Sequence, residues 1–381
     1  MLLLVSGLTH GLLGMWLLDA FPKLRARKRV VYGVLASLVG MATVTRLLTI
    51  ATHSEILGSI FAAAMCELII VLFSAVPLVL VRGVARLVDS IAPPATKAAT
   101  ETEVSRRQAI ERVGGVAVVG ATASLVGWGA LVGRHDFVVE EVAVRIVGLP
   151  RVLDGYTIAQ ISDLHVGLLM SEDDLTEGLN KLASTPSDLV VITGDILDFD
   201  PKYIPLAARL LSKIRARDGV FAIYGNHDHY TGASAVGTAL RAAGIDVLVN
   251  DGRVIRAKDG GGFALLGVDD LASLRSGGPG PRLDRAMSAV PDDRPRILLS
   301  HQPATVDIWA GRVALQLSGH THGGQFNPFG LRPADLIMHY VAGRYEVGKT
   351  SLWVNRGFGV VGPPARVGAP PEVTKIVLVA A

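Results

Sequence analysis

The chain has 381 residues, of which 50% are hydrophobic and only 19% are charged. Its mean hydropathy of +0.43 is too high for a typical soluble enzyme of this length, so part of the chain is predicted to lie in a membrane. The net charge of +3 and the pI near 9.0 do not indicate a nucleic-acid partner, because much of the basic excess flanks apolar stretches.

The first third of the chain contains apolar stretches that approach or exceed the ~20 residues needed to cross a bilayer. These predicted spans are residues 1–20, 30–50, 56–81 and 113–133, with a linker over residues 82–112 that is rich in Pro, Ala and Thr between residues 91 and 102. We therefore predict a transmembrane region over residues 1–134 and a separate domain over residues 135–381.

The distribution of basic residues predicts how the spans are oriented. Five Lys and Arg residues lie between the first two spans, and residues 52–55, between the second and third, contain none. Since basic loops stay in the cytoplasm, the chain is predicted to start outside and the fourth span to place the second domain outside the cytoplasm. We expect a multi-pass plasma-membrane protein. The sole cysteine, Cys66, lies in the third span and excludes an intrachain disulfide.

Two features of the membrane region lead to more specific expectations. His10 and Glu67 fall inside predicted spans at similar depth, and we predict that they face each other, because ionisable groups in a bilayer need partners. The alternatives are Arg46 as the partner of Glu67, which is less favoured, and a protonated Glu67 bonded to a backbone carbonyl. Arg106-Arg107 before the fourth span is similar to a twin-arginine export signal, which would make the export machinery a partner, but it could equally be a basic flank.

After residue 135, short runs rich in β-branched residues each end in a polar block. The runs are residues 157–162, 189–193, 220–224, 297–300 and 313–318, and the blocks are D-L-H at 163–165, G-D-I-L-D at 194–198, G-N-H-D at 225–228, S-H at 300–301 and G-H-T-H at 319–322. Open α/β sheets collect ligands beyond the carboxyl ends of their strands, so these blocks are predicted to converge. Gly194 and Gly225 suit places where the backbone turns sharply or approaches an ion.

Each block alone could be an ordinary turn or helix cap, but five in this order are not explained that way. The pattern resembles the calcineurin-like metallophosphoesterase superfamily, and the segments around Gln325, 355–359 and 370–372 resemble its membrane-attached bacterial branch, which acts on cell-wall or lipid-linked substrates. The resemblance covers roughly residues 140–380. It implies an α/β fold of four layers, with two β-sheets packed face to face and helices outside, here preceded by the all-α transmembrane region. Predicted helices at 172–183, 204–216, 233–243 and 282–289 suit such a domain.

The same resemblance implies a site for two divalent metal ions, of which Mn, Fe, Zn and Co all suit the ligands. One ion would take Asp163, His165, Asp195 and His322. The second would share the bridging Asp195 and add Asn226, His301 and His320.

Two further residues of these blocks are expected to act in catalysis. The resemblance leaves His227 beside a ligand without being one, so it is expected to stabilise the phosphoryl group or protonate the leaving oxygen, with Asp198 orienting it. A hydroxide bridging the two ions would attack phosphorus.

Three other features of the sequence each allow two interpretations. Residues 168–170 form an apolar lip or ordinary core, His229 touches substrate or is solvated, and Asp269 and Asp270 are catalytic or cap a turn.

The function predicted is a membrane-anchored phosphohydrolase that cleaves a phosphoester or pyrophosphate in an envelope or lipid-linked substrate. Its partners would be that phosphorylated small-molecule or lipid-linked substrate and the membrane, with no nucleic acid. The alternative is a membrane-bound binding or sensor protein that keeps the fold without turnover. A transporter is disfavoured by the small number of spans.

Overall fold

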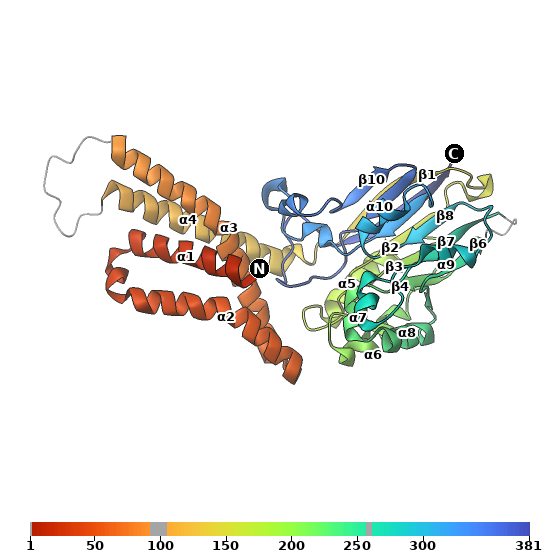
Figure 1. Cartoon of the computed structure of the whole chain (residues 1–381), viewed down its shortest axis with the longest axis horizontal. Helices are drawn as coiled ribbons and strands as arrows, with labels where there is room; N and C mark the ends of the chain where they lie inside the picture. Colours follow the sequence, from red (N-terminus) through yellow and green to blue (C-terminus); the bar gives the residue numbers. More distant parts are fainter. Residues whose placement is uncertain (1, 92–104, 257–260) are drawn as a thin grey trace. The chain divides into compact units, whose positions relative to one another are not determined.

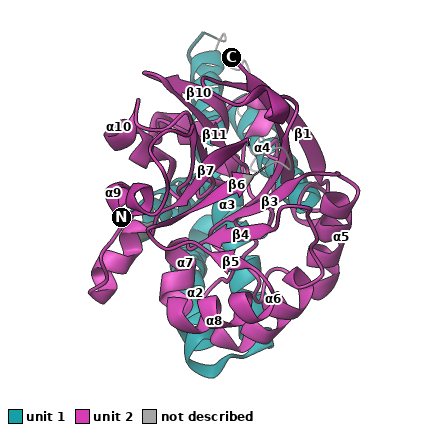
Figure 2. Cartoon of the chain, turned by 90° about the vertical axis from the view of Figure 1, so that its right-hand side faces the viewer, with its two compact units in different colours: residues 1–129, 362–364 teal, residues 130–361, 365–381 magenta. Residues whose placement is uncertain are grey.

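The computed structural model describes residues 2–91, 105–256 and 261–381. The chain divides into two compact units, which Figure 2 colours separately. Residues 1–129 with 362–364 form the helical unit, and residues 130–361 with 365–381 form the sheet unit. Residues 92–104 of the predicted 82–112 linker lie outside the described residues.

The helical unit contains four helices that are long and apolar enough to cross a membrane. They are α1 (Leu2–Ala20), α2 (Lys28–Thr52), α3 (Glu55–Ile91) and α4 (Arg106–Trp128), joined in part by the short helix η1 (Pro22–Arg27) and drawn in red to orange in Figure 1. Helix α3 continues ten residues past the expected end of the third span at residue 81. Helix α4 begins seven residues before the expected start at 113, since Ser105 caps it by accepting a hydrogen bond from the backbone N–H of Gln108.

Buried polar contacts tie these helices together. The indole N–H of Trp16 in α1 donates to the backbone oxygen of Glu111 in α4 at 2.8 Å, and a side chain at Gly115 would overlap the indole. Near the same end of α1, Asp19 pairs with Arg82 of α3 at 2.7 Å. Each contact joins helices that are distant in sequence. These polar contacts therefore fix how the helices pack against one another, which apolar surfaces alone would not do.

The predicted contact between His10 and Glu67 is confirmed. His10 Nε2 lies 3.1 Å from Glu67 Oε1, linking α1 to α3, and the imidazole is only 2% exposed. His10 Nδ1 lies 2.8 Å from the backbone oxygen of Ser6, so both ring nitrogens have partners. The prediction succeeded because α1 and α3 pack against each other, which brings residues at similar heights along the two helices together.

We expect Glu67→Ala to destabilise the helical unit, because it leaves the buried His10 Nε2 without its partner at a cost of about 1–3 kcal/mol. Glu67→Gln is the matched control, since its side-chain amide can still form a hydrogen bond with His10 Nε2. Thermal unfolding of the full chain in detergent should show a clearly lower midpoint for the alanine variant. Equal midpoints for the two variants would contradict a paired His10.

The sheet unit consists of two six-stranded mixed sheets. The first contains, in spatial order, β1 (Val138–Ile146), β12 (Glu372–Ala380), β2 (Thr157–Ile161), β3 (Leu189–Thr193), β4 (Val220–Ile223) and β5 (Asp246–Val247). The second contains β10 (Gly343–Val347), β11 (Thr350–Val354), β9 (Leu315–Ser318), β8 (Arg296–Leu299), β7 (Gly262–Gly267) and β6 (Asp251–Arg256). Within them β2 to β5 are parallel to one another, as are β7, β8, β9 and β11.

The alternation of side chains along the strands separates three apolar layers. In β3, Val191 belongs to the cluster between the two sheets, and Val190 faces the opposite side. Leu299 of β8 and Leu317 of β9 join the same central cluster, so it is formed by both sheets. The outer layers are completed by helices α5 (Glu172–Ala183), α6 (Ile204–Leu211) and α8 (Ala233–Ala242) on the first sheet and by α9 (Leu283–Ser288) and α10 (Val306–Trp309) on the second (Figure 1). The predicted four-layer α/β sandwich is confirmed.

Candidate metal centre

All five polar blocks follow strands whose carboxyl ends point to one edge of the sandwich. Asp163 and His165 follow β2, Asp195 follows β3, and Asn226 opens the short helix α7 (Asn226–Thr231) after β4. His301 follows β8, and His320 and His322 follow β9, so both sheets contribute. Since these strands are parallel within each sheet, their ends bring the blocks together, as predicted.

The side chains form three overlapping groups whose nitrogen and oxygen atoms lie within 4.8 Å of one another. The groups are Asp163 with His165 and His322, His165 with Asp195 and His227, and Asp195 with His301 and His320. His165 and Asp195 each belong to two groups, so the three form one continuous cluster. Asp163, His165 and Asp195 are each no more than 2% exposed.

The orientation of His301 indicates what this cluster can hold. Its Nδ1 lies 2.8 Å from the backbone oxygen of Thr193, which can only accept, so Nδ1 carries the proton. When the ring is neutral, its Nε2 therefore directs a lone pair at Asp195 Oδ2, 3.2 Å away. A lone pair and a carboxylate oxygen repel each other unless a cation or a proton lies between them. The Nε2 atoms of His165 and His322 lie 3.0 Å apart, so they share either a proton or a cation.

Asn226 supports the same conclusion. Its Oδ1 is buried and has no hydrogen-bond partner among the described residues, which is costly for an amide oxygen. The next residue, His227, donates its backbone N–H to Asp195 Oδ1 at 2.8 Å, so Asn226 begins its helix beside the central carboxylate. Imidazole, carboxylate and amide oxygen ligands suit divalent cations such as Mn²⁺, Fe²⁺, Zn²⁺ and Co²⁺. The residues present thus fit a pair of such ions.

The backbone is strained at most of the proposed metal ligands. A positive φ is uncommon for residues other than glycine, and such strain concentrates at functional sites. The residues of the cluster that adopt it are Asp163 (φ 53°), His165 (47°), Asp195 (51°), His320 (74°) and His322 (52°). Five of the seven proposed ligands are therefore held in a conformation that folding alone would avoid.

Glycines allow the backbone to approach Asp195 closely. Gly194 has a φ of +92°, and a Cβ there would lie 2.7 Å from the backbone nitrogen of Gly225. A Cβ on Gly225 would lie 2.2 Å from Asp195 Oδ1. The expectation that these glycines allow a sharp turn and a close approach is confirmed.

Asp228 holds the turn that carries Asn226 and His227. It is 0% exposed, and its Oδ1 accepts from the backbone N–H groups of Ile196 and Leu197, both at 3.0 Å, and its Oδ2 from Gly225 at 2.9 Å. Burial and the nearby Asp195 charge raise the pKa of Asp228 to about 6.

We expect Asp228→Asn to destabilise the sheet unit by about 1–3 kcal/mol, because the new amide group would oppose a backbone N–H with a second donor. The matched control is Asp292→Asn, at a carboxylate that is 93% exposed. Thermal unfolding of the full chain should separate the two variants. If both melt at the temperature of the unsubstituted chain, Asp228 does not hold the turn.

The charges of the cluster shift the pKa values of its members. Burial opposes ionisation of Asp195, but the imidazoles of His301, His165 and His227 hold its pKa below the usual range. Although burial disfavours a charged imidazole, the Asp195 carboxylate raises the pKa of His301 well above its ordinary value. Burial, reinforced by His165 and Arg366, lowers the pKa of His322 and keeps it neutral, the form that binds metal.

His227 lies at the rim of the cluster with one nitrogen fixed. Its Nδ1 is 2.9 Å from the backbone oxygen of Asp198 and 3.2 Å from Asp198 Oδ1. Since these oxygens accept, Nδ1 carries the proton and Nε2 is the atom left for other partners. Burial lowers the pKa of His227, but the hydrogen bond to Asp198 and the Asp195 charge outweigh it and raise the pKa. Its ring also contacts that of Phe199, with centroids 4.5 Å apart.

The sequence did not point to Arg366, which is 1% exposed and braces the final block. Its guanidinium donates to the backbone oxygen of Ala369 at 2.9 Å and of Arg356 at 3.0 Å, and one of its nitrogens lies 3.3 Å from His322 Nδ1. No sequence pattern marked it. A single arginine among Pro, Gly and Val residues carries no local signal of burial.

Three open expectations concern residues around the cluster. Met170 is 1% exposed and belongs to the apolar core, and Leu169 packs against that core, so these two residues are core and do not form a lip. His229 is not a solvated loop histidine, because its side chain is 10% exposed and its Nε2 lies 2.8 Å from Asp269 Oδ1. Asp270 caps the following turn by accepting from the backbone N–H of Ala272.

Comparison with known proteins agrees with this geometry. Residues 156–324 match the family model described as calcineurin-like phosphoesterase. The chain is 33% identical over 287 residues to "Uncharacterized metallophosphoesterase YkuE" of Bacillus subtilis, covering 72% of this chain and 98% of that protein. It is also 33% identical to "Transmembrane protein with metallophosphoesterase domain" of Danio rerio, covering 68% of this chain and 61% of that protein.

A solved structure, the sulfate thiohydrolase SoxB of Thermus thermophilus, covers 59% of this chain and 56% of its own at 14% identity, but its TM-score of 0.37 is too low to carry an argument. The fold and the cluster define a metal-dependent phosphoester hydrolase. The chain belongs to the calcineurin-like metallophosphoesterase family. Members of this family generally use a pair of divalent metal ions.

Proposed function

We propose that the protein is a membrane-anchored phosphohydrolase with a two-metal site, acting on a phosphoester or pyrophosphate group of an envelope or lipid-linked substrate. The observation that carries this proposal is the continuous cluster in which Asp195 lies between His165 and His301. The four apolar helices support the anchoring, and the Bacillus subtilis relative, which matches over nearly its full length, supports the class of reaction.

The proposed ligands divide around Asp195. Asp163, His165 and His322 would hold one ion, Asn226, His301 and His320 the other, and Asp195 would contact both. Bound there, two divalent cations would supply the Lewis acidity and the lowered pKa of water that phosphoester hydrolysis needs at neutral pH.

The chain's own residues supply the remaining chemistry. The Asp198 backbone oxygen holds the Nδ1 proton of His227, and the Asp198 and Asp195 carboxylates favour the doubly protonated ring, so the imidazolium would give its Nε2 proton to the leaving oxygen of the substrate and remain neutral. His301 is held for its role by the Thr193 carbonyl, and Asp228 holds the turn that bears Asn226. These contacts orient each functional atom before substrate arrives.

The distribution of basic residues supports a proposal for the location of the protein. The basic segment between α1 and α2 favours the cytoplasmic side, which would place the sheet unit outside the cytoplasm of a multi-pass plasma-membrane protein. Arg107 lies 3.1 Å from Glu111 and 3.8 Å from Asp19. These ion pairs support a basic flank of α4 that takes part in the bundle, in preference to a twin-arginine export signal.

The test is a substrate and metal panel on the purified full chain. After removal of metal with a chelator, Mn²⁺, Fe²⁺, Zn²⁺ and Co²⁺ are restored separately, and lipid-linked, nucleotide-linked and aryl phosphates are offered, with products identified by mass. We expect turnover only with restored metal and fastest turnover on a lipid-linked phosphate. A chain that binds metal but cleaves none of them would instead be a binding or sensor protein.

A further inference from the structure

The loop that follows the last metal block exposes large apolar side chains. In residues 328–339, here called the apolar loop, Phe329 is 93% exposed, Leu336 88%, Ile337 83% and Leu331 68%. Single exposed apolar residues are ordinary, but four within nine residues form a cluster that a water-facing surface disfavours. Nothing in the sheet unit's proposed chemistry requires them.

The backbone of the apolar loop turns Phe329 outward at a cost. Phe329 has a φ of 56°, a conformation that is unfavourable for a bulky residue, and the loop is built from two short turns, Pro328–Gly330 and Pro333–Leu336. A strained backbone that projects a phenyl ring away from the core does not stabilise the fold. It indicates a partner for the ring.

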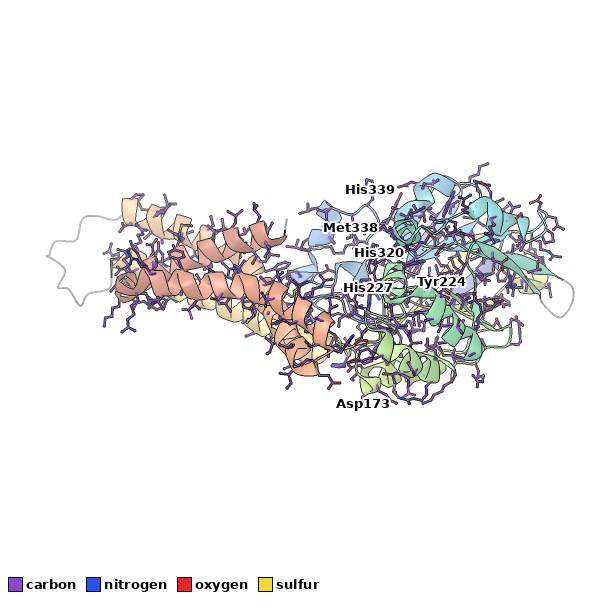
Figure 3. The ribbon with its side chains drawn as sticks, turned by 60° about the horizontal axis from the view of Figure 1, so that its bottom comes forward. Asp173, Tyr224, His227, His320, Met338 and His339 are labelled. Carbon is purple, nitrogen blue, oxygen red and sulfur yellow. The ribbon has the colours of Figure 1, made fainter. Side chains whose placement is uncertain are left out.

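The base of the apolar loop is fixed to the metal blocks. The side-chain amide of Asn327 donates to the backbone oxygen of Gly323 at 2.8 Å, just after His322, and Thr321, between His320 and His322, donates its hydroxyl to the backbone oxygen of Val341 at 2.6 Å. The Tyr340 hydroxyl donates to Asp307 at 2.6 Å. Figure 3 labels Met338 and His339 at the end of this loop, on the same side of the sheet unit as His320.

We propose that the apolar loop is a second membrane contact, which dips into the lipid surface and holds the metal-bearing edge of the sheet unit close to the headgroups. This rests on the membrane anchoring proposed above. Lipid is the occupant that suits the surface, because the exposed apolar side chains accompany one ion pair, Arg332 with Asp335 at 3.1 Å, in a segment of low net charge. Such a mixture lies stably at the boundary of acyl chains and headgroups.

The consequence for the proposed reaction concerns the class of substrate. An edge held at the headgroup level meets phosphates that are attached to lipids without first extracting them. The apolar loop would have the role that the sequence suggested for residues 168–170. It follows the last metal block, whereas residues 168–170 lie between the first and second blocks.

The test measures the surroundings of single nitroxide labels on the full chain reconstituted in phosphatidylcholine and phosphatidylglycerol vesicles. In a Cys66→Ala background, cysteine is placed at Phe329 or Ile337, and accessibility to oxygen, which concentrates in lipid, is compared with accessibility to a water-soluble nickel chelate. Ile308 of α10, 70% exposed in the same unit, is the matched control. Leu47 of α2, 63% exposed, reports the anchor.

We expect the labels at 329 and 337 to show high oxygen and low nickel accessibility, with the opposite at 308. High nickel accessibility at 329 and 337 would mean a water-facing loop and overturn the proposal. Low accessibility to both reagents would overturn it as well, because it means cover by protein, either the helical unit or a second copy. A water-like signal at 47 would overturn the anchoring itself, which separates failure of the proposed function from failure of the loop.

Discussion

Asp195→Asn should abolish hydrolysis and empty the metal site. Asp195 Oδ2 lies 3.2 Å from His301 Nε2 and 3.7 Å from His165 Nε2, so this carboxylate joins the two halves of the cluster. Asparagine keeps the shape but removes the charge that would offset two cations. We expect a loss of activity of more than about a hundredfold, since removing even an indirect partner of a metal ligand costs 10–100-fold.

The measurement pairs turnover of an aryl phosphate with metal content by elemental analysis. Asp173→Asn is the control, an exposed carboxylate of the same unit that Figure 3 labels far from His320. It should retain both activity and metal. An Asp195→Asn protein that keeps its full metal content and activity would be incompatible with a bridging role for this residue.

The elements that were predicted well are those whose signal is local. Strand β3 occupies Leu189–Thr193 and helix α5 occupies Glu172–Ala183, the ranges expected from the sequence. A run of five β-branched and apolar residues can be buried on both faces only as an inner strand. Helix α5 starts at a capping box in which Ser171 accepts from the N–H of Asp174 and Asp174 accepts from Ser171, a signal carried within four residues.

The elements that were missed depend on distant partners. Helix α7 coincides with the G-N-H-D block, whose Gly, Asn and Asp are all turn formers, and it forms because Asp228 accepts from Gly225 while also binding the loop after β3. Strand β1, Val138–Ile146, was not expected, since it is an edge strand whose exposed positions mix apolar and charged residues, and its pairing partner is β12, more than two hundred residues later.

The sequence predicted which side chains form the candidate site, but it did not predict the residue that supports them. The metal-ligand candidates can be recognised in the sequence because imidazoles and carboxylates recur at predicted strand ends in a fixed order. Arg366 does not, because its acceptors are backbone oxygens of Ala369, Arg356 and Gly359, which any sequence would supply. Tertiary structure alone decides that these oxygens gather around one guanidinium beside His322.

His227→Gln should impair the cleavage of substrates with poor leaving groups far more than that of activated ones. If the His227 Nε2 gives a proton to the leaving oxygen, an alkyl phosphate depends on it and should lose about 10²–10⁴-fold in turnover. A nitrophenyl phosphate releases a stable anion that needs no proton, so its turnover should fall much less. Measuring both substrates with one variant separates proton donation from a general loss of active protein.

The grouping of His227 with His165 and Asp195 within 4.8 Å leaves a second possibility, that His227 binds a metal ion. Elemental analysis of His227→Gln distinguishes the two, because a proton donor can be removed with metal content unchanged, whereas loss of a ligand lowers it. The control is His229→Gln, two residues along α7, whose side-chain amide can still donate to Asp269. Equal losses on both substrates together with depleted metal would assign His227 to the metal ligands, and Asp198 would then position a ligand instead of an acid.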